Sequence, residues 1–217
     1  TMTNGVYGLL GVNGAGKTTT IKMLTGLTRP TSGEAYVMGR SINTELAKVK
    51  KLVSVSPQET AVAPNLTVRE NLEFIAGIYG MDRKHTKEKT DELVREFSME
   101  EVEKSKAKTL SGGWQRRLSI AMALITEPKI LFLDEPTLGL DVIARRELWQ
   151  IINSVKKNVT IVLTTHYMEE AEALSDRIGI MKGGKLLMVG TAEELKRAAG
   201  KDKFEEAFVA IVKGETI

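Results

Sequence analysis

The feature that most constrains this chain is a glycine-rich loop close to its beginning. The segment from Gly11 to Thr18 reads Gly-Val-Asn-Gly-Ala-Gly-Lys-Thr and fits the pattern G-x-x-x-x-G-K-[ST]. It follows an apolar run, Val6–Leu10, that predicts a buried strand, and it leads into a helix predicted over Lys17–Gly26. The glycines let the backbone turn tightly, so that successive N–H groups and the positive end of the helix face one anion. The pattern therefore predicts a phosphate-binding loop in which Lys17 reaches the phosphates and the Thr18 hydroxyl can ligate Mg²⁺.

Strands and helices alternate through much of the remaining sequence. Apolar or β-branched runs predict strands over Ala35–Met38, Leu52–Val55, Lys129–Asp134, Val159–Thr164, Ile178–Met181 and Lys185–Val189. Helical patterns cover Val142–Val155, Thr191–Ala199 and Phe204–Val212. This alternation predicts an α/β fold, a P-loop NTPase core with a mostly parallel sheet.

The alternation is interrupted between residues 57 and 110, where the patterns are helical. Asn65–Leu72 looks like a helix start, in which Thr67 as N-cap and Glu70 would form a capping box. Thr86–Phe97 is rich in Lys and Glu and has a sparse apolar stripe, as expected of a surface helix. We therefore predict a helical, signature-bearing lobe over residues 57–110, inserted between core segments 1–56 and 111–217.

The composition narrows the classes of function. Lys and Arg number 31 against 28 Asp and Glu, and this net charge of +3 does not indicate a nucleic-acid-binding protein. The absence of cysteine excludes disulfides and cysteine-based zinc sites. No apolar run approaches the roughly 18 residues that cross a bilayer, and the first residues show no signal-peptide pattern. Any role at a membrane is therefore expected to be peripheral, through a partner.

A second segment supplies the carboxylates that a phosphate-binding loop needs. Ile130-Leu-Phe-Leu-Asp134 is an apolar strand that ends in an acid, and Glu135 follows it. A core strand would deliver Asp134 to the edge of the sheet where Mg²⁺ sits beside the glycine-rich loop. Glu135 could polarise the attacking water, because a nucleoside triphosphatase needs a carboxylate aimed at that water. The two segments together predict a triphosphatase.

The segment Leu110-Ser-Gly-Gly113 distinguishes among triphosphatases, because it resembles the signature motif of ABC ATPases. Ser111 is a suitable N-cap for a helix predicted through Ile125, and the two glycines expose the first amides of that helix to an anion. The resemblance covers essentially the whole chain. Further motifs of the family follow in register, with Gln58 resembling the Q-loop glutamine, Pro136–Asp141 the D-loop and His166 the switch histidine.

The resemblance implies which residues hold the nucleotide and act on it. The implied catalytic residues are Glu135, His166 and Gln58, and the implied ligands of Mg²⁺ are Thr18, Gln58 and Asp134. Contacts with ATP are implied for Asn13, Gly14, Ala15, Gly16, Lys17, Thr18, Thr19, Ser111, Gly112, Gly113 and Asp141. In this family the signature faces the γ-phosphate held by the opposite subunit, so the implied partner is a second ATPase subunit in a homodimer. ATP binding and hydrolysis would then drive a membrane transporter through formation of an ATP-sandwich dimer.

The chain resembles more narrowly the subunits of drug, sodium and antimicrobial-peptide exporters. This resemblance lies in Gly8–Gly14, Leu66–Leu72 and Phe204–Phe208. It implies a multi-span membrane permease as a partner, received by Gln58–Tyr79, and a peripheral position on the cytoplasmic face of the cell membrane. The transported substrate cannot be read from this sequence, because the membrane subunits would recognise it.

Three features depart from the family pattern. Trp114 follows the signature where many members have Gln, and Leu138 takes a D-loop position that is often small. Few residues precede Val6–Leu10, where the family has an antiparallel β-region with an aromatic residue that stacks on adenine. Tyr7 is the nearest aromatic residue and is expected to pack in the core. An exposed apolar flank of the sheet and weak ATP binding are therefore expected.

Two other classes stay open as alternatives. A soluble ABC ATPase acting on ribosomes or DNA usually carries two cassettes, a long coiled-coil insert or zinc-binding cysteines, and none of these occurs here. A P-loop kinase or GTPase is disfavoured by Ser111–Gly113 and His166. A neighbouring gene for a multi-span membrane protein would favour transport over the first alternative.

Overall fold

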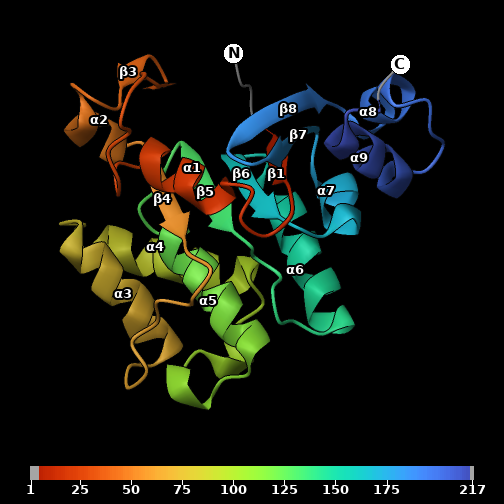
Figure 1. Ribbon diagram of the computed structural model, residues 1–217. Coiled ribbons are helices and arrows are strands. Elements are labelled where there is room, and N and C mark those ends of the chain that lie inside the picture. Colours follow the sequence, from red (N-terminus) through yellow and green to blue (C-terminus); the bar gives the residue numbers. More distant parts are fainter. Residues whose placement is uncertain (1–4, 216–217) are drawn as a thin grey trace.

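The computed structural model describes residues 5–215 and has a six-stranded sheet at its centre (Figure 1). In spatial order the strands are β4 (Val53–Ser56), β5 (Ile130–Asp134), β6 (Thr160–Thr165), β1 (Val6–Leu10), β7 (Arg177–Lys182) and β8 (Lys185–Gly190). Neighbouring strands from β4 to β7 pair in parallel, and β8 returns antiparallel to β7. The predicted α/β fold with a mostly parallel sheet is confirmed.

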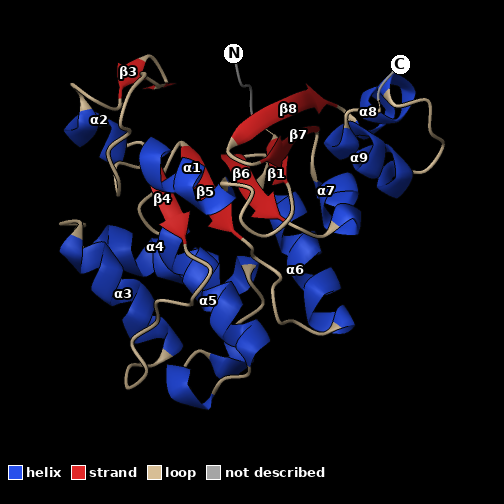
Figure 2. Cartoon of the chain, viewed as in Figure 1, coloured by secondary structure: helices blue, strands red, loops and turns tan. Residues whose placement is uncertain are grey.

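Helices cover both faces of the sheet (Figure 2). They are α1 (Lys17–Leu24), α2 (Leu46–Lys50), α3 (Val68–Ile78), α4 (Arg83–Glu96), α5 (Gly112–Leu124), α6 (Val142–Val155), α7 (Met168–Leu174), α8 (Ala192–Ala198) and α9 (Phe204–Lys213). The helices α3, α4 and α5 gather beside β4, whereas α8 and α9 pack on β7 and β8 at the other end of the sheet (Figure 1). A small ribbon of β2 (Tyr36–Val37) and β3 (Arg40–Ser41) lies next to α2.

The central strands are apolar on both faces, which explains their continuous apolar runs. Leu131 and Leu133 of β5 join the cluster that includes α5 and α6. Phe132, between them, joins the opposite cluster with Ile21 of α1. Because successive residues of a strand point to opposite faces, only a nearly all-apolar strand can be buried on both sides.

Local signals set several helix starts. The capping box of Thr67 and Glu70 at the start of α3 is confirmed. The predicted start of α4 at Thr86 is wrong, because the Asp82 carboxylate accepts from the His85 N–H at 2.9 Å and the helix begins at Arg83.

Other boundaries also differ from the expected ones. The first helix ends at Leu24, before the predicted Gly26, because the chain turns there and Gly26 has a φ of +70°. Ser111 is the N-cap residue of α5, as predicted, although its hydroxyl makes no capping hydrogen bond. The short elements α2, β3 and α7 were not predicted, since segments of this length carry little periodic signal.

The segment between residues 57 and 110 folds into α3, α4 and two 3₁₀ turns, Glu100–Val102 and Ala107–Thr109. Arg69 of α3 forms an ion pair with Asp91 of α4 at 2.5 Å. An apolar cluster runs from Leu72 and Phe97 in this segment through α5 to the sheet. The predicted lobe and the sheet thus share one apolar interior, and the predicted lobe boundaries at residues 57 and 110 stay a prediction.

One face of the sheet is only partly covered. A hollow of about 570 Å³ lies between the sheet and the β2–β3 ribbon, lined by Tyr7, Leu9, Phe132 and Val162 among others. It lies on the side of the sheet that α1 flanks, and Tyr7 packs there against the Ile21 cluster. Within residues 5–215, no helix has the length and apolar character needed to cross a membrane.

Candidate functional site

The glycine-rich loop joins β1 to α1 at the carboxyl edge of the sheet. Gly16, directly before α1, has a φ of +100°, which residues with a Cβ rarely adopt. Gly11 lies so close to β7 that a Cβ would stand 2.5 Å from the Met181 carbonyl oxygen. These two glycines therefore allow the tight path of the loop over the end of the sheet.

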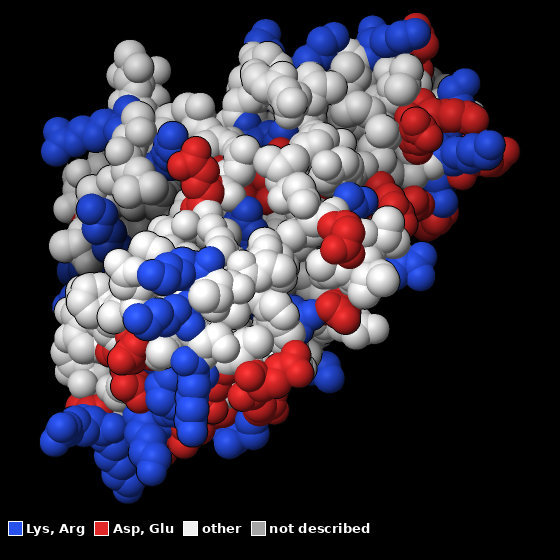
Figure 3. All heavy atoms as spheres, turned by 90° about the horizontal axis from the view of Figure 1, so that it is seen from below, with Lys and Arg blue, Asp and Glu red and all other residues white. Residues whose placement is uncertain are grey.

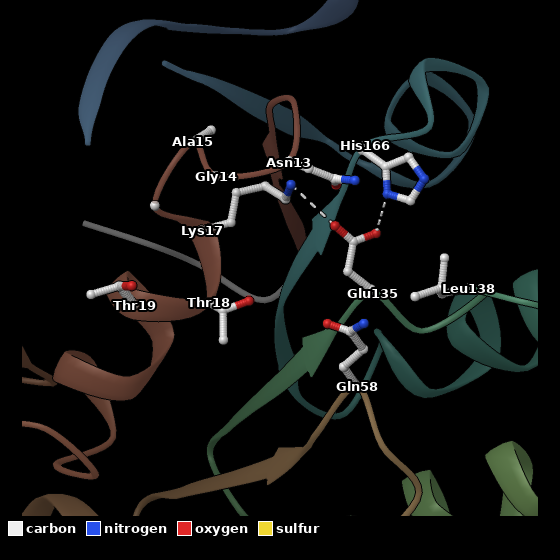
Figure 4. A pocket seen from close by; sticks show the side chains of 11 residues that line it. Asn13, Gly14, Ala15, Lys17, Thr18, Thr19, Gln58, Glu135, Leu138 and His166 are labelled. Carbon is white, nitrogen blue, oxygen red and sulfur yellow. Dashed lines mark hydrogen bonds and ion pairs between the residues drawn. The ribbon is translucent and has the colours of Figure 1, made fainter. Parts of the chain in front are cut away.

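The loop borders a cavity of about 440 Å³ (Figure 4). Its lining residues come from the loop, from α1 and from the segments that follow β4, β5 and β6, and they are Asn13, Gly14, Ala15, Gly16, Lys17, Thr18, Thr19, Gln58, Glu135, Leu138 and His166. The structure thus brings together ten residues predicted for the nucleotide site. Leu138, which departs from the family pattern in the D-loop, lines the same cavity.

Glu135 is the central carboxylate of this cavity. One of its oxygens, Oε1, lies 3.1 Å from Lys17 Nζ, and the other, Oε2, lies 2.7 Å from His166 Nδ1 (Figure 4). Glu135 is 5% exposed and has a φ of +49°, a left-handed conformation that is unusual for a residue other than glycine. Its N–H donates to the Thr164 hydroxyl at 3.0 Å. This hydrogen bond and the contacts with Lys17 and His166 hold Glu135 in its strained conformation, with the carboxylate between a lysine and a histidine.

Asp134 and Thr18 form the oxygen-rich corner of the site. The Thr18 hydroxyl donates to Asp134 Oδ1 at 3.1 Å, and the Thr164 hydroxyl donates to the same oxygen. A buried carboxylate beside a hydroxyl suits a hard cation such as Mg²⁺. Among the described residues there is no group of three or more His, Cys, Asp or Glu that could hold a metal. These residues therefore fit Mg²⁺ only if phosphate oxygens and water complete its coordination.

Thr164 was missed by the sequence analysis although it has a recognisable position. It lies directly opposite Asp134 on the neighbouring strand β6. Its hydroxyl bridges the Asp134 carboxylate and the Glu135 N–H, so it orients both acids. A hydroxyl residue near the end of the strand next to the acidic one is the signal that could have identified it.

The predicted signature and D-loop residues Ser111, Gly113 and Asp141 do not line this cavity. Asp141 Oδ1 accepts from the N–H groups of Ile143 and Ala144, each at 2.9 Å, and so caps α6. A Cβ at Gly113 would stand 3.2 Å from Ala144 Cβ, so the start of α5 packs closely on α6.

A second hollow, of about 370 Å³, separates the signature helix from the nucleotide cavity. Gly112, Gln58 and Leu138 all line it, and it therefore lies between the start of α5 and the loops that follow β4 and β5. Arg116 of α5 also lines it and donates hydrogen bonds to the carbonyl oxygens of Pro57 and Gln58. The sequence analysis missed Arg116, because its partners lie far away along the chain.

A buried acid, Glu170 of α7, lies behind the site. It is fully buried, and the Trp149 indole N–H donates to its Oε1 at 3.3 Å. Burial raises the pKa of Glu170, and the negative charge of Glu135 raises it further, whereas the nearby polar groups of Thr165, Thr137 and Trp149 lower it. No sequence signal distinguishes Glu170 from its exposed neighbour Glu169.

The charged side chains on the face shown in Figure 3 are mixed, with Lys and Arg lying among Asp and Glu. Nucleic-acid-binding surfaces typically gather positive charge on one face. The expectation that the chain does not act on nucleic acid stays a prediction.

A profile of the family described as "ABC transporter" matches residues 2–138, which is more than half of the chain. The chain is 41% identical over 213 residues to the probable multidrug ABC transporter ATP-binding protein YbhF of Escherichia coli, covering 95% of this chain and 37% of YbhF. It is 45% identical over 192 residues to the human phospholipid-transporting ATPase ABCA3, covering 88% of this chain and 11% of ABCA3. The chain therefore spans well under half of the length of these relatives.

Solved structures resemble the whole fold. The structure of an ATP-binding subunit of an ABC transporter matches with a TM-score of 0.83 and 30% identity, covering 96% of this chain and 88% of that one. The structure of cbiO1 from Clostridium perfringens, described as part of the ABC transporter complex cbiONQ, matches with a TM-score of 0.82 and 25% identity, covering 89% and 80% of the two chains.

Proposed function

The chain belongs to the ABC transporter family as an ATP-binding domain, and on that premise we propose that its cavity binds MgATP and hydrolyses it to drive transport. The observation that carries this proposal is the buried Glu135 carboxylate, held between Lys17 and His166 at the phosphate-binding loop. A carboxylate there can act on a water beside the terminal phosphate of ATP.

We propose that the loop amides and Lys17 bind the β- and γ-phosphates. Lys17 Nζ donates to the Gly11 carbonyl at 2.7 Å and is paired with Glu135, so its charge already faces the cavity. Thr18, Asp134 and Gln58 would hold Mg²⁺, which when bound neutralises charge on the phosphates. This assignment agrees with the adjacent oxygen atoms of Thr18 and Asp134.

Glu135 is the proposed general base. Its carboxylate accepts a proton from the attacking water, while His166 Nδ1 keeps Oε2 in position. For Nε2 also to donate to a γ-phosphate oxygen, where charge develops during transfer, both ring nitrogens must carry a proton, and we propose that His166 does so in the complex with ATP. Gln58 extends into the same cavity from the segment after β4, and we propose that it orients the water and the cation (Figure 4).

A homodimer is the proposed working form. Ser111, Gly113 and Asp141 lie outside the cavity that the same chain forms around its loop. The exposed first amides of α5 nevertheless form an anion-binding helix end, with Gly112 and Gly113 as its first residues. These observations support the proposal that the signature of one chain completes the site of a second.

We further propose that the whole protein is an exporter with a membrane-spanning permease and works on the cytoplasmic side. The names of YbhF and ABCA3 describe a multidrug transporter and a phospholipid transporter, and cbiO1 is described as part of a transporter complex. The chain spans only part of YbhF and ABCA3, so the substrate and the partner are not carried over from them.

The nucleotide assignment can be tested by calorimetry and ATP hydrolysis on the full chain. Lys17→Ala removes a charge-assisted bond worth about 1.5–3 kcal/mol, so ATP affinity should fall about tenfold to a hundredfold. Lys22→Ala, an exposed lysine on the same helix, is the matched control and should bind ATP as the unmodified chain does. Equal ATP affinity in the two variants, or no magnesium-dependent hydrolysis by the unmodified chain, would contradict the proposal.

A further inference from the structure

Arg116 links the signature helix to the main chain at Gln58. It is 5% exposed and lies on α5, shortly after Gly112 and Gly113. Its Nη1 donates to the Pro57 carbonyl at 2.7 Å, and its Nη2 donates to the carbonyl of Gln58. One rigid, planar guanidinium therefore fixes two consecutive peptide units.

The partners of Arg116 are unusual for a buried charge. In the described part of the chain its hydrogen bonds go to carbonyl oxygens, and the carboxylates of Asp134 and Glu170 attract it only from a longer range. Burial accordingly lowers the pKa of the Arg116 guanidinium. Removing a charge from water is costly, and an apolar side chain would fill the same space without that cost. The arrangement is therefore best explained by what the side chain holds in place.

A second contact joins the same two segments. The hydroxyls of Ser56, at the end of β4, and Ser119, on α5, lie 3.0 Å apart and are buried. This pair joins α5 to the strand, whereas Arg116 reaches past the strand to Gln58. Displacement of the Gln58 peptide must therefore either break the Arg116 hydrogen bonds or move α5.

We propose that Arg116 is a positioning residue that couples the conformation of Gln58 in the nucleotide cavity to the orientation of the signature helix α5. The inference rests on the proposed function and deepens it. When MgATP engages the Gln58 side chain, the guanidinium transmits the shift of the Gln58 backbone to α5 and thereby to Ser111–Gly113. Without the guanidinium, Gln58 loses its fixed backbone, and the helix no longer responds to the nucleotide.

The chain carries a reporter for this coupling. Its two tryptophans are Trp114 and Trp149, so Trp149→Phe leaves one fluorophore. Trp114 lies in the first turn of α5, partly buried, with the Arg117 guanidinium 4.4 Å from its ring centroid. Its emission therefore reports the surroundings of the signature helix independently of hydrolysis.

The test uses the full chain with Trp149→Phe as the parent. Arg116→Met removes the charge and both hydrogen bonds, and Arg116→Lys keeps a charge but cannot bridge two carbonyls with a planar fork. Glu147→Gln is the control, because it removes the ion pair of Arg117 with Glu147 that joins the same helix to α6. MgATP affinity, kcat, KM and the change in Trp114 emission on adding MgATP are measured for each variant, with thermal melts to verify folding.

Arg116→Met is expected to bind MgATP within about threefold of the parent and to lose about tenfold to a hundredfold in kcat, as expected for charged hydrogen bonds of about 1.5–3 kcal/mol. Its Trp114 response should disappear, and Arg116→Lys should lie between this variant and the parent. If Arg116→Met does not fold, Arg116→Lys decides the matter by the same measurements. Glu147→Gln should keep both the kcat and the Trp114 response.

Two results would overturn the coupling alone: a folded Arg116 variant with the kcat and Trp114 response of the parent, or equal losses in Glu147→Gln. A parent chain that neither binds nor hydrolyses MgATP would instead refute the proposed function, and the coupling with it.

Discussion

The Glu135→Gln substitution removes one proton acceptor from the nucleotide cavity and keeps the shape of the side chain. In the structure both carboxylate oxygens are engaged, Oε1 with Lys17 Nζ at 3.1 Å and Oε2 with His166 Nδ1 at 2.7 Å. An amide can keep a hydrogen bond in this position, but it cannot take a proton from water. The left-handed backbone at Glu135 is equally demanding for Gln, so the fold should tolerate the change.

The expected loss follows from the role assigned to the carboxylate. General base catalysis typically contributes about 10²-fold to 10⁴-fold, so kcat should fall by at least about 100-fold, which is about 2.7 kcal/mol of barrier. ATP affinity should stay unchanged or become tighter. Removing a buried negative charge from the cavity reduces its repulsion of the phosphates and leaves Lys17 free to bind them.

The assay combines ATP hydrolysis at saturating MgATP with calorimetry of MgATP binding, on the unmodified chain and the variant. Glu169→Gln, an exposed carboxylate on α7, is a control for the loss of one negative charge near the surface and should keep the full rate. Equal turnover by Glu135→Gln and the unmodified chain would refute the assignment of the base. A parallel loss of ATP affinity would show that Glu135 supports the fold of the cavity and not the chemical step.

Two further predictions concern the buried acid and the dimer. In the unfolded chain the Glu170 carboxyl ionises near its ordinary pKa of 4.5, whereas in the folded chain burial raises this pKa. Burying the carboxyl therefore lowers the free energy of unfolding at neutral pH, and this loss disappears below the ordinary pKa. Glu170→Gln should therefore raise Tm at neutral pH, by about 2–4 °C for each 1 kcal/mol gained, and the gain should vanish below the ordinary pKa. Thermal melts at several pH values test this prediction, and the control Glu169→Gln should keep the Tm of the unmodified chain. A gain in the Tm of Glu170→Gln that does not depend on pH would contradict the prediction. Ser111→Arg should keep mononucleotide binding but prevent MgATP-driven dimerisation of the Glu135→Gln chain. Sedimentation that still shows a MgATP-dependent dimer would contradict the proposed role of the signature.

Features that depend on near neighbours and on periodicity can be predicted from the sequence. The spacing of Gly11, Gly16 and Lys17 specifies a turn in which few residues other than glycine fit, and the structure has that turn. The capping box at Thr67 and Glu70 needs only a hydrogen bond between residues three apart. The nearly all-apolar run of β5 likewise indicates a strand buried on both faces.

The contacts between residues far apart in the chain follow from the packing of the whole fold. Gln58 lies beside Arg116 because β4 takes the edge of the parallel sheet and α5 packs on it, and no local pattern encodes that pairing. Glu135 lies between Lys17 and His166 because β5, β6 and β1 are adjacent in the sheet although far apart in the chain. Glu170 and its neighbour Glu169 are alike in sequence, and only the packing of α7, which places Glu170 beside Trp149, decides which carboxyl leaves water. Burial and long-range hydrogen bonds depend on the summed packing of the whole core, whereas turns and caps depend on a few consecutive residues.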